Sequence, residues 1–194
     1  EMQNHFDSIP VIDVKSTTKL DINTSDWVRF SIDNFDLATQ KWEEPKSHYT
    51  SQANKWATIN NIVGRNIHNS FELNYGMLGD GNDKLKTILG RNNIKLLGID
   101  WDTVLVRLLV KFPGHGMAWH EDSLDSYVLK FDLPDTSKVK RYWFSIDDWQ
   151  DGHVFQVSKT VLSNWTKGEA FDLLFGIDHA SSHFGYRPMY SVSF

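Results

Sequence analysis

A histidine and an aspartate stand two positions apart in GMAWHEDS, residues 116–123, just after the most apolar run of the chain. In an extended backbone residues i and i+2 project to the same side, so His120 and Asp122 can reach one metal ion while Glu121 points away. Two imidazoles and one carboxylate on one face form the iron(II) site of many oxygenases. Because a His-x-Asp triplet also occurs by chance in surface turns, its meaning depends on a second histidine further along.

Candidates for the remaining groups lie in GIDHASSHFGYRPMYSVSF, residues 176–194, which contains His179, His183 and Arg187. Either histidine could supply the second imidazole. Arg187 follows His179 by eight positions, and a guanidinium forms paired, charge-assisted hydrogen bonds with a carboxylate. Arg187 is therefore a candidate for holding the far end of a dicarboxylate, the alternative being an ordinary exposed arginine on a last strand.

The composition excludes several other kinds of site. The 194 residues include no cysteine, which leaves histidine and carboxylates as the metal ligands. A net charge of −5 gives no reason to expect nucleic acid as a partner. The sequence contains neither a long apolar run nor a signal peptide, so we expect no membrane span and a soluble, cytoplasmic protein. Nothing in the sequence indicates the oligomeric state.

These side chains must be positioned by strands, because β-favouring segments separated by Pro, Gly, Asp or Asn dominate the chain from residue 101 onward. The spacing is typical of a jelly-roll double sheet, so the fold class is mostly β with flanking helices. We expect one domain, 1–194, with supporting strands and helices in about 1–100 and the metal-binding core in about 101–194. The predicted core strands are 102–112, 125–133, 139–148, 153–159, 169–175 and 187–194.

The N-terminal half gives weaker signals. Residues 8–14 and 27–33 are rich in β-branched and aromatic residues and are predicted as strands. Apolar spacing and a following glycine predict a helix at 82–90. Residues 47–59 could form another helix, and the glycine-rich segment 76–83 is interpreted as a turn.

Three segments resemble a known family: PGHGMAWH (113–120), DWQDGHVFQV (148–157) and NWTKGEAFDLLFGIDHASSHFGYR (164–187). Together they resemble the iron(II)- and 2-oxoglutarate-dependent oxygenases, most closely the aspartyl/asparaginyl β-hydroxylase-like group. The resemblance covers about residues 101–194 and implies a double-stranded β-helix with a jelly-roll, cupin-like core.

The resemblance also implies roles for single residues. His120, Asp122 and His179 would be the metal ligands, Arg187 would bind the cosubstrate carboxylate, and Arg141 would be a second cosubstrate contact. His183 would lie in the cosubstrate pocket. Vertebrate members of the group lack the carboxylate ligand, whereas this chain has Asp122. A carboxylate at this position favours hydroxylation over halogenation, because halogenases have a small residue there that leaves room for chloride.

The function implied is a dioxygenase that hydroxylates an unactivated carbon of an amino acid, a peptide residue or another small substrate, releasing succinate and carbon dioxide. Its cofactors would be Fe(II), 2-oxoglutarate and O2, with ascorbate as a reductant. Two alternatives stay open at this point: a cupin-like metal-dependent isomerase or dioxygenase that does not use 2-oxoglutarate, and a non-enzymatic jelly-roll binding module.

Overall fold

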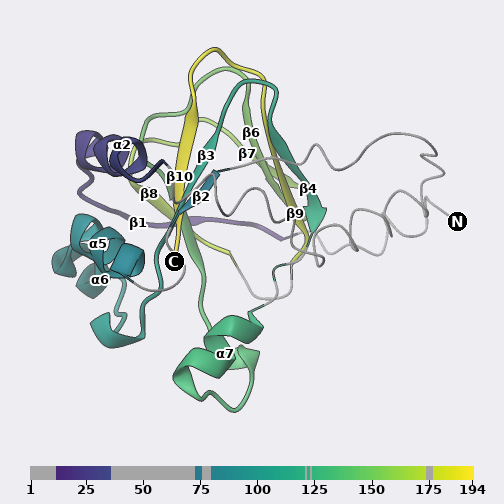
Figure 1. Ribbon diagram of the computed structural model, residues 1–194. Coiled ribbons are helices and arrows are strands. Elements are labelled where there is room, and N and C mark those ends of the chain that lie inside the picture. The colour runs from purple at the N-terminus through teal and green to yellow at the C-terminus, as the bar shows by residue number, and fades with distance from the viewer. Residues whose placement is uncertain (1–11, 36–72, 76–79, 121, 123, 174–176) are drawn as a thin grey trace, which may run out of the picture.

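Two antiparallel sheets form the centre of the computed structural model, which describes residues 12–35, 73–75, 80–120, 122, 124–173 and 177–194 (Figure 1). Within these ranges the strands are β1 (Ser16–Lys19), β2 (Leu73–Tyr75), β3 (Arg107–Lys111), β4 (Gly116–His120), β5 (Tyr142–Ser145), β6 (His153–Val157), β7 (Thr160–Leu162), β8 (Glu169–Asp172), β9 (His179–His183) and β10 (Met189–Ser193). The helices are α2 (Thr24–Asp33), α5 (Asp80–Leu89), α6 (Arg91–Leu96) and α7 (Asp125–Phe131), with 3₁₀ turns η2 (Trp101–Thr103) and η3 (Thr136–Lys138).

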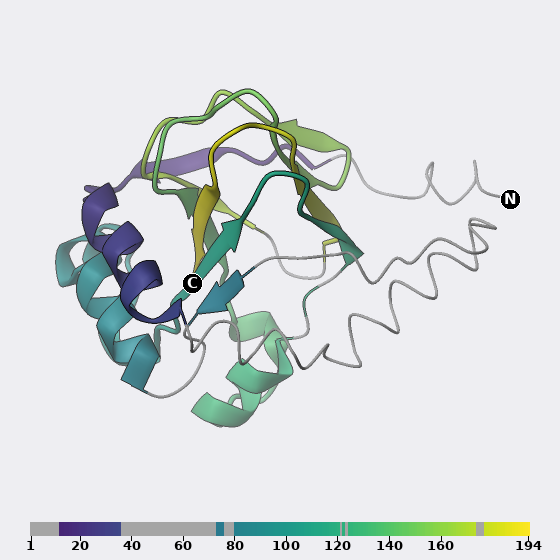
Figure 2. The same ribbon diagram turned by 45° about the horizontal axis from the view of Figure 1, so that its top comes forward.

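The order of the strands identifies the architecture. One sheet runs β1-β8-β5-β10-β3-β2 and the other β4-β9-β6-β7. From β3 to β10 the chain therefore alternates between the sheets, with only β6 and β7 placed consecutively in the same one. This winding is the jelly-roll double-stranded β-helix of cupin-like proteins, and the mostly β class predicted from the sequence is confirmed (Figure 2).

Helices α2, α5 and α6 cover the outer face of the six-stranded sheet (Figure 1). Because side chains alternate along a strand, Leu108 and Val110 of β3 join Phe144 of β5 on this face. Trp27 of α2 is fully buried against them and meets the Phe144 ring edge-on, with the ring centroids 6.0 Å apart. The helices thus give this sheet a second buried face and leave its inner face to build the site.

The inner face meets the four-stranded sheet through a separate apolar cluster. Trp143 of β5 stacks on Phe155 of β6 with ring centroids 4.6 Å apart, and the Trp165 ring meets Trp143 edge-on at 5.1 Å. Met189 of β10 packs in the same cluster. These contacts fix the spacing between the sheets.

Two predicted strands are helices. Residues 27–33 belong to α2, where the Asn23 side chain accepts a hydrogen bond from Ser25 N and Trp27, Phe30 and Ser31 are buried at helical spacing. The β-favouring composition of this segment misled the prediction because burial follows a period of 3.6 residues here.

Residues 125–133 were also wrongly predicted as a strand, since residues 125–131 form α7. Leu129 is 82% exposed, so the apolar residues of this segment do not line up on one buried face. Asp132, in the left-handed conformation at φ 50°, ends the helix. The segment packs in neither sheet, and therefore no neighbouring strand supplies the pairing that its composition favours.

The remaining predictions have mixed outcomes. The helix at 82–90 is confirmed, although α5 begins at Asp80 and takes in part of the segment 76–83 that was interpreted as a turn. Residues 12–14 are not in a strand, while 8–11 and the possible helix at 47–59 lie outside the described residues. None of the helices in the described ranges has the length and apolarity needed to cross a bilayer.

Candidate functional site

Strands β4 and β9 bring the predicted ligands together. They pair antiparallel, and in their register His120 stands directly opposite His179. Directly opposed residues in an antiparallel pair have Cβ atoms about 5 Å apart, close enough to share one ligand. Asp122 follows β4 by two residues. The backbone therefore places the three predicted ligands at one end of the pair, although the His120 side chain lies outside what the structure describes.

His179 is held in the orientation that a metal ligand needs. Its ring is 6% exposed, and Nδ1 lies 3.0 Å from the Ile177 carbonyl oxygen. When Nδ1–H donates to that carbonyl, the lone pair of Nε2 faces the pocket, which is the usual arrangement of a metal-binding histidine. The ring is supported by an edge-on contact with Phe155, with centroids 6.0 Å apart.

The carboxylate of Asp122 meets this imidazole. Its Oδ2 lies 3.4 Å from His179 Nε2, and the Asp122 side chain is 11% exposed. Two ligand atoms each about 2.1 Å from one ion, at a right angle, are about 3 Å apart. The separation and chemistry of these two atoms therefore fit adjacent positions around one metal ion.

Arg141 completes the cluster. It directly precedes β5, and its Nη1 forms an ion pair with Asp122 Oδ2 and lies 3.3 Å from His179 Nε2. Its Nε donates a hydrogen bond to Ser193 Oγ at 3.0 Å. The structure thus brings together Asp122, His179 and Arg141, three of the residues selected from the sequence.

The structure describes only two of the three predicted metal-ligand side chains. Among the residues that the structure describes, no three His or acidic side chains gather closely enough to hold an ion. Asp122 and His179 make up two of the three that the sequence predicts. The third, His120, contributes only its backbone position opposite His179.

A pocket opens beside these groups between the two sheets. Its empty volume, including the space open to solvent, is about 380 Å³. Among the described residues that line it, Asp122 is a carboxylate and Arg107, Lys111 and Arg141 are cations. The described lining residues are Arg107, Leu109, Lys111, Met117, Asp122, Arg141, Trp143, Phe155, His179, Ser181 and Met189.

Two of these cations, Arg107 and Lys111, were missed by the sequence analysis. They lie at the ends of β3, are 8% and 3% exposed, and share its inner face with Leu109. A signal was available: two charges at even spacing in an otherwise apolar strand point to one face, and a buried cation requires an anionic or polar partner. Among the described lining residues cations outnumber carboxylates, which favours an anionic ligand.

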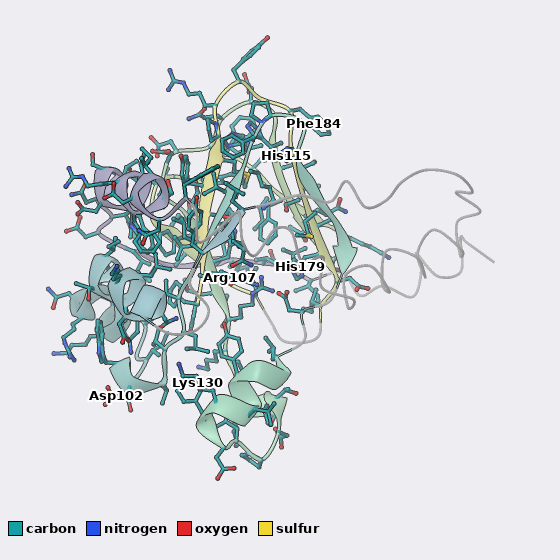
Figure 3. All side chains as sticks on the ribbon, in the orientation of Figure 1. Asp102, Arg107, His115, Lys130, His179 and Phe184 are labelled. Carbon is teal, nitrogen blue, oxygen red and sulfur yellow. The ribbon has the colours of Figure 1, made fainter. Side chains whose placement is uncertain are left out.

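The other two predicted residues lie elsewhere. His183 is at the far end of β9 from His179, is fully buried, and meets the His153 ring edge-on with centroids 4.5 Å apart. Arg187 is exposed on the following turn, and its carbonyl oxygen lies 3.4 Å from His153 Nε2. Neither side chain lines the pocket. In Figure 3, His179 and Arg107 lie near one end of the sheets, while His115 and Phe184 lie near the other.

Burial governs the chemistry of the distal histidine pair. Desolvation lowers the pKa of His153, and the neighbouring His183 lowers it further. Desolvation also lowers the pKa of His183, with smaller contributions in the same direction from Lys111 and His115. Both rings therefore favour the neutral form, which suits a packed structural pair.

Comparison with known proteins finds structural likenesses at low sequence identity. No family model and no curated protein matches the chain. A predicted oxalate decarboxylase from Thermotoga maritima is similar to it at 11% identity and a TM-score of 0.33, over 46% of this chain and 62% of that chain. A cupin domain from Bordetella pertussis is similar at 13% identity and a TM-score of 0.33, over 46% of this chain and 76% of that one.

A protein with a double-stranded β-helix domain from Klebsiella pneumoniae is also similar, at 18% identity and a TM-score of 0.31, over 46% of this chain and 59% of that one. This chain spans less than two thirds of two of these three structures. Likenesses this distant carry no weight for activity. The fold assignment rests on the strand order, which is that of a cupin-like double-stranded β-helix.

Proposed function

We propose that the protein is an iron(II)- and 2-oxoglutarate-dependent dioxygenase that hydroxylates an amino acid, a peptide residue or another small substrate. The observation that carries the proposal is the meeting of Asp122 and His179 at 3.4 Å, with His120 opposite His179 in register, beside a pocket lined by three cations. One carboxylate with two imidazoles is the ligand set of such oxygenases.

In this proposal Asp122, His179 and His120 hold the metal. When bound, iron(II) supplies, with 2-oxoglutarate and O2, the oxidising power to hydroxylate an unactivated carbon, releasing succinate and carbon dioxide. A hydrogen bond from His179 Nδ1–H to the Ile177 carbonyl would leave the Nε2 lone pair for this role.

The buried cations hold and orient the dicarboxylate. Arg141 lies next to the ligands and Lys111 lies at the other end of β3 from Arg107, so cationic groups stand at both ends of the pocket. Charge-assisted hydrogen bonds from such groups fix a carboxylate strongly when water is excluded. Trp143, Phe155 and Met189 provide the apolar wall that excludes it. The cosubstrate-binding roles of Arg187 and His183 stay predictions. Neither side chain is among the residues that line this pocket.

The test is an assay of succinate release with candidate amino acids and peptides under Fe(II), ascorbate and 2-oxoglutarate. We expect release with the wild type and a loss of at least about a hundredfold in Asp122→Ala, since this change removes a ligand that contacts the metal. A Mn²⁺ titration of both proteins gives a second readout, in which the variant should bind more weakly. Lys159→Gln, an exposed change on the turn after β6, is the control.

The alternative is a cupin-like enzyme that uses the same metal ligands without 2-oxoglutarate. The cations that line the pocket would still favour an anionic substrate for it. Omitting 2-oxoglutarate separates the two. Turnover that continues without it contradicts the first proposal. Absence of Mn²⁺ binding by the wild type at micromolar metal contradicts both enzymes and leaves a binding module.

A further inference from the structure

We propose that Arg141 is a built-in counter-cation, which occupies the metal position in the metal-free protein and which metal binding releases toward an anionic ligand. The inference concerns regulation of the site proposed above, and it rests on that proposed function. It makes the pocket ready for an anion only after the metal has bound.

The position of the guanidinium carries the inference. Arg141 Nη1 contacts Asp122 Oδ2 and His179 Nε2, the two atoms proposed to bind the metal. Those atoms are themselves 3.4 Å apart. The guanidinium therefore pairs with the negative charge of Asp122 and contacts the Nε2 atom of His179, the two groups that would bind the metal.

Burial makes this cation necessary when no metal is bound. The side chains of Asp122 and Arg141 are 11% and 12% exposed. A carboxylate withdrawn from water is costly unless a charge partner and hydrogen bonds compensate it. Arg141 supplies that compensation, so the pocket can form before metal arrives.

The backbone of Arg141 is fixed, whereas its guanidinium is held by side-chain contacts that can be exchanged. Its carbonyl accepts a hydrogen bond from Leu173 N at 2.8 Å, which holds the backbone beside β8, and Nε donates to Ser193 Oγ of β10. The contacts with Asp122 and His179 are made by Nη1, at the far end of the side chain. Because Nε and Nη1 belong to one planar guanidinium, rotation about the Cγ–Cδ and Cδ–Nε bonds exchanges these contacts for others within the pocket and also releases the hydrogen bond to Ser193 Oγ.

Electrostatics sets the direction of the exchange. A divalent ion on Asp122 and His179 repels a guanidinium within a few ångströms, and in a buried site this repulsion is weakly screened. The ion also takes up the lone pairs that Nη1 contacts. Arg141 then loses its contact with Asp122 in a pocket that already contains Arg107 and Lys111, which raises the affinity of the pocket for an anion.

The test is a calorimetric titration with Mn²⁺ alone, in the absence of any organic ligand. We expect Arg141→Gln to bind Mn²⁺ on the order of tenfold more tightly than the wild type, because the competing cation is gone. We also expect the melting temperature of metal-free Arg141→Gln to fall, because Asp122 loses its partner, and to recover when Mn²⁺ is added. Lys159→Gln, which removes one exposed positive charge, should show neither effect.

The outcomes separate this inference from the proposed function. If the wild type binds Mn²⁺ and Asp122→Asn abolishes binding, but Arg141→Gln binds no more tightly than the wild type, the inference is overturned and the metal site stands. If the wild type binds no Mn²⁺, the proposed function itself fails. Should Arg141→Gln not fold, Arg141→Met removes the charge while keeping an unbranched side chain, and it should bind Mn²⁺ more tightly than the wild type; equal or weaker binding overturns the inference.

Discussion

At the scale of single residues, three polar side chains from different parts of the sequence meet in the candidate site. Asp122, His179 and Arg141 were selected from the sequence and lie in mutual contact. Lys111 and Arg107 were not selected, because the segment 102–112 that contains them was interpreted as an apolar strand. The structure shows that β3 pairs with β10 and that the face carrying these two residues lines the pocket. The spacing of residues along a strand predicts which of them share a face, but not which other strand packs against that face.

In the proposed function, Lys111 and Arg187 are competing candidates for binding the far carboxylate of 2-oxoglutarate. Lys111 is 3% exposed and lines the pocket, whereas Arg187 is exposed on a turn. We expect Lys111→Met to raise the KM for 2-oxoglutarate roughly tenfold to a hundredfold, since a hydrogen bond to a charged group contributes about 1.5–3 kcal/mol. Arg187→Gln should raise it less, as steady-state succinate release at varied 2-oxoglutarate will report. The reverse order would favour the role implied by the family resemblance.

At the scale of elements, strands β4 and β9, which position His120 and His179, have the weakest β-strand signal in the sequence. GMAWH and HASSH, which form β4 and β9, contain no β-branched residue, and neither was predicted as a strand. They are extended because β9 is paired on both sides, with β4 and with β6. Local propensity is a weak guide where tertiary pairing satisfies the backbone in this way. Conversely, the β-favouring segment of α7 has no such partner and becomes a helix.

Gly116 controls how closely β4 approaches β9. A Cβ added there would lie 2.9 Å from the Ser181 carbonyl oxygen, so the strands must move apart to admit it. We expect Gly116→Ala to lower the free energy of unfolding by about 1–3 kcal/mol and to weaken Mn²⁺ binding, because His120 lies on the displaced strand. Urea denaturation and a Mn²⁺ titration measure the two effects.

Gly98→Ala is the matched control for this change. At Gly98 a Cβ meets nothing within 4 Å, but φ is +68°, so alanine there should destabilise the fold by about 1–2 kcal/mol without affecting the metal site. Equal Mn²⁺ affinities for the two variants would show that the spacing of β4 and β9 at Gly116 does not set the geometry of the site.

At the scale of the whole molecule, the two ends of the four-stranded sheet differ in character. One end holds the polar cluster of Asp122, His179 and Arg141, and the other is closed by the buried pair His153 and His183. The sequence indicated the jelly-roll class because turn residues recur at regular spacing, but it could not separate the ends. Which histidine faces the pocket and which one packs in the interior depends on the register of β9 against both of its neighbours.

The distal pair makes the stability of the molecule dependent on pH. Burial lowers the pKa of both histidines below the value near 6.5 that they have in the unfolded chain. As pH falls through 6.5 the unfolded chain takes up protons first, so the stability present above that pH is lost on further acidification. We expect the free energy of unfolding to fall by at most about 1.4 kcal/mol per pH unit for each histidine.

Urea denaturation at several pH values between 7.5 and 5 measures this loss, and His153→Phe isolates the contribution of the pair. Phenylalanine keeps an aromatic ring for the edge contact with His183 but does not titrate. The slope of stability against pH should therefore become shallower in the variant. An unchanged slope would show that other groups cause the acid sensitivity.

The strand order also has a consequence for folding. Strand β10, at residues 189–193, lies inside the six-stranded sheet between β5 and β3, while β1 pairs with β8 across more than 150 residues of sequence. The sheet therefore cannot assemble during synthesis until residue 193 has left the ribosome. Chains dominated by such distant pairings fold slowly, in milliseconds to seconds, and expose unpaired strand edges meanwhile. Until β10 is inserted, β3 and β5 therefore each lack a neighbouring strand in the nascent chain.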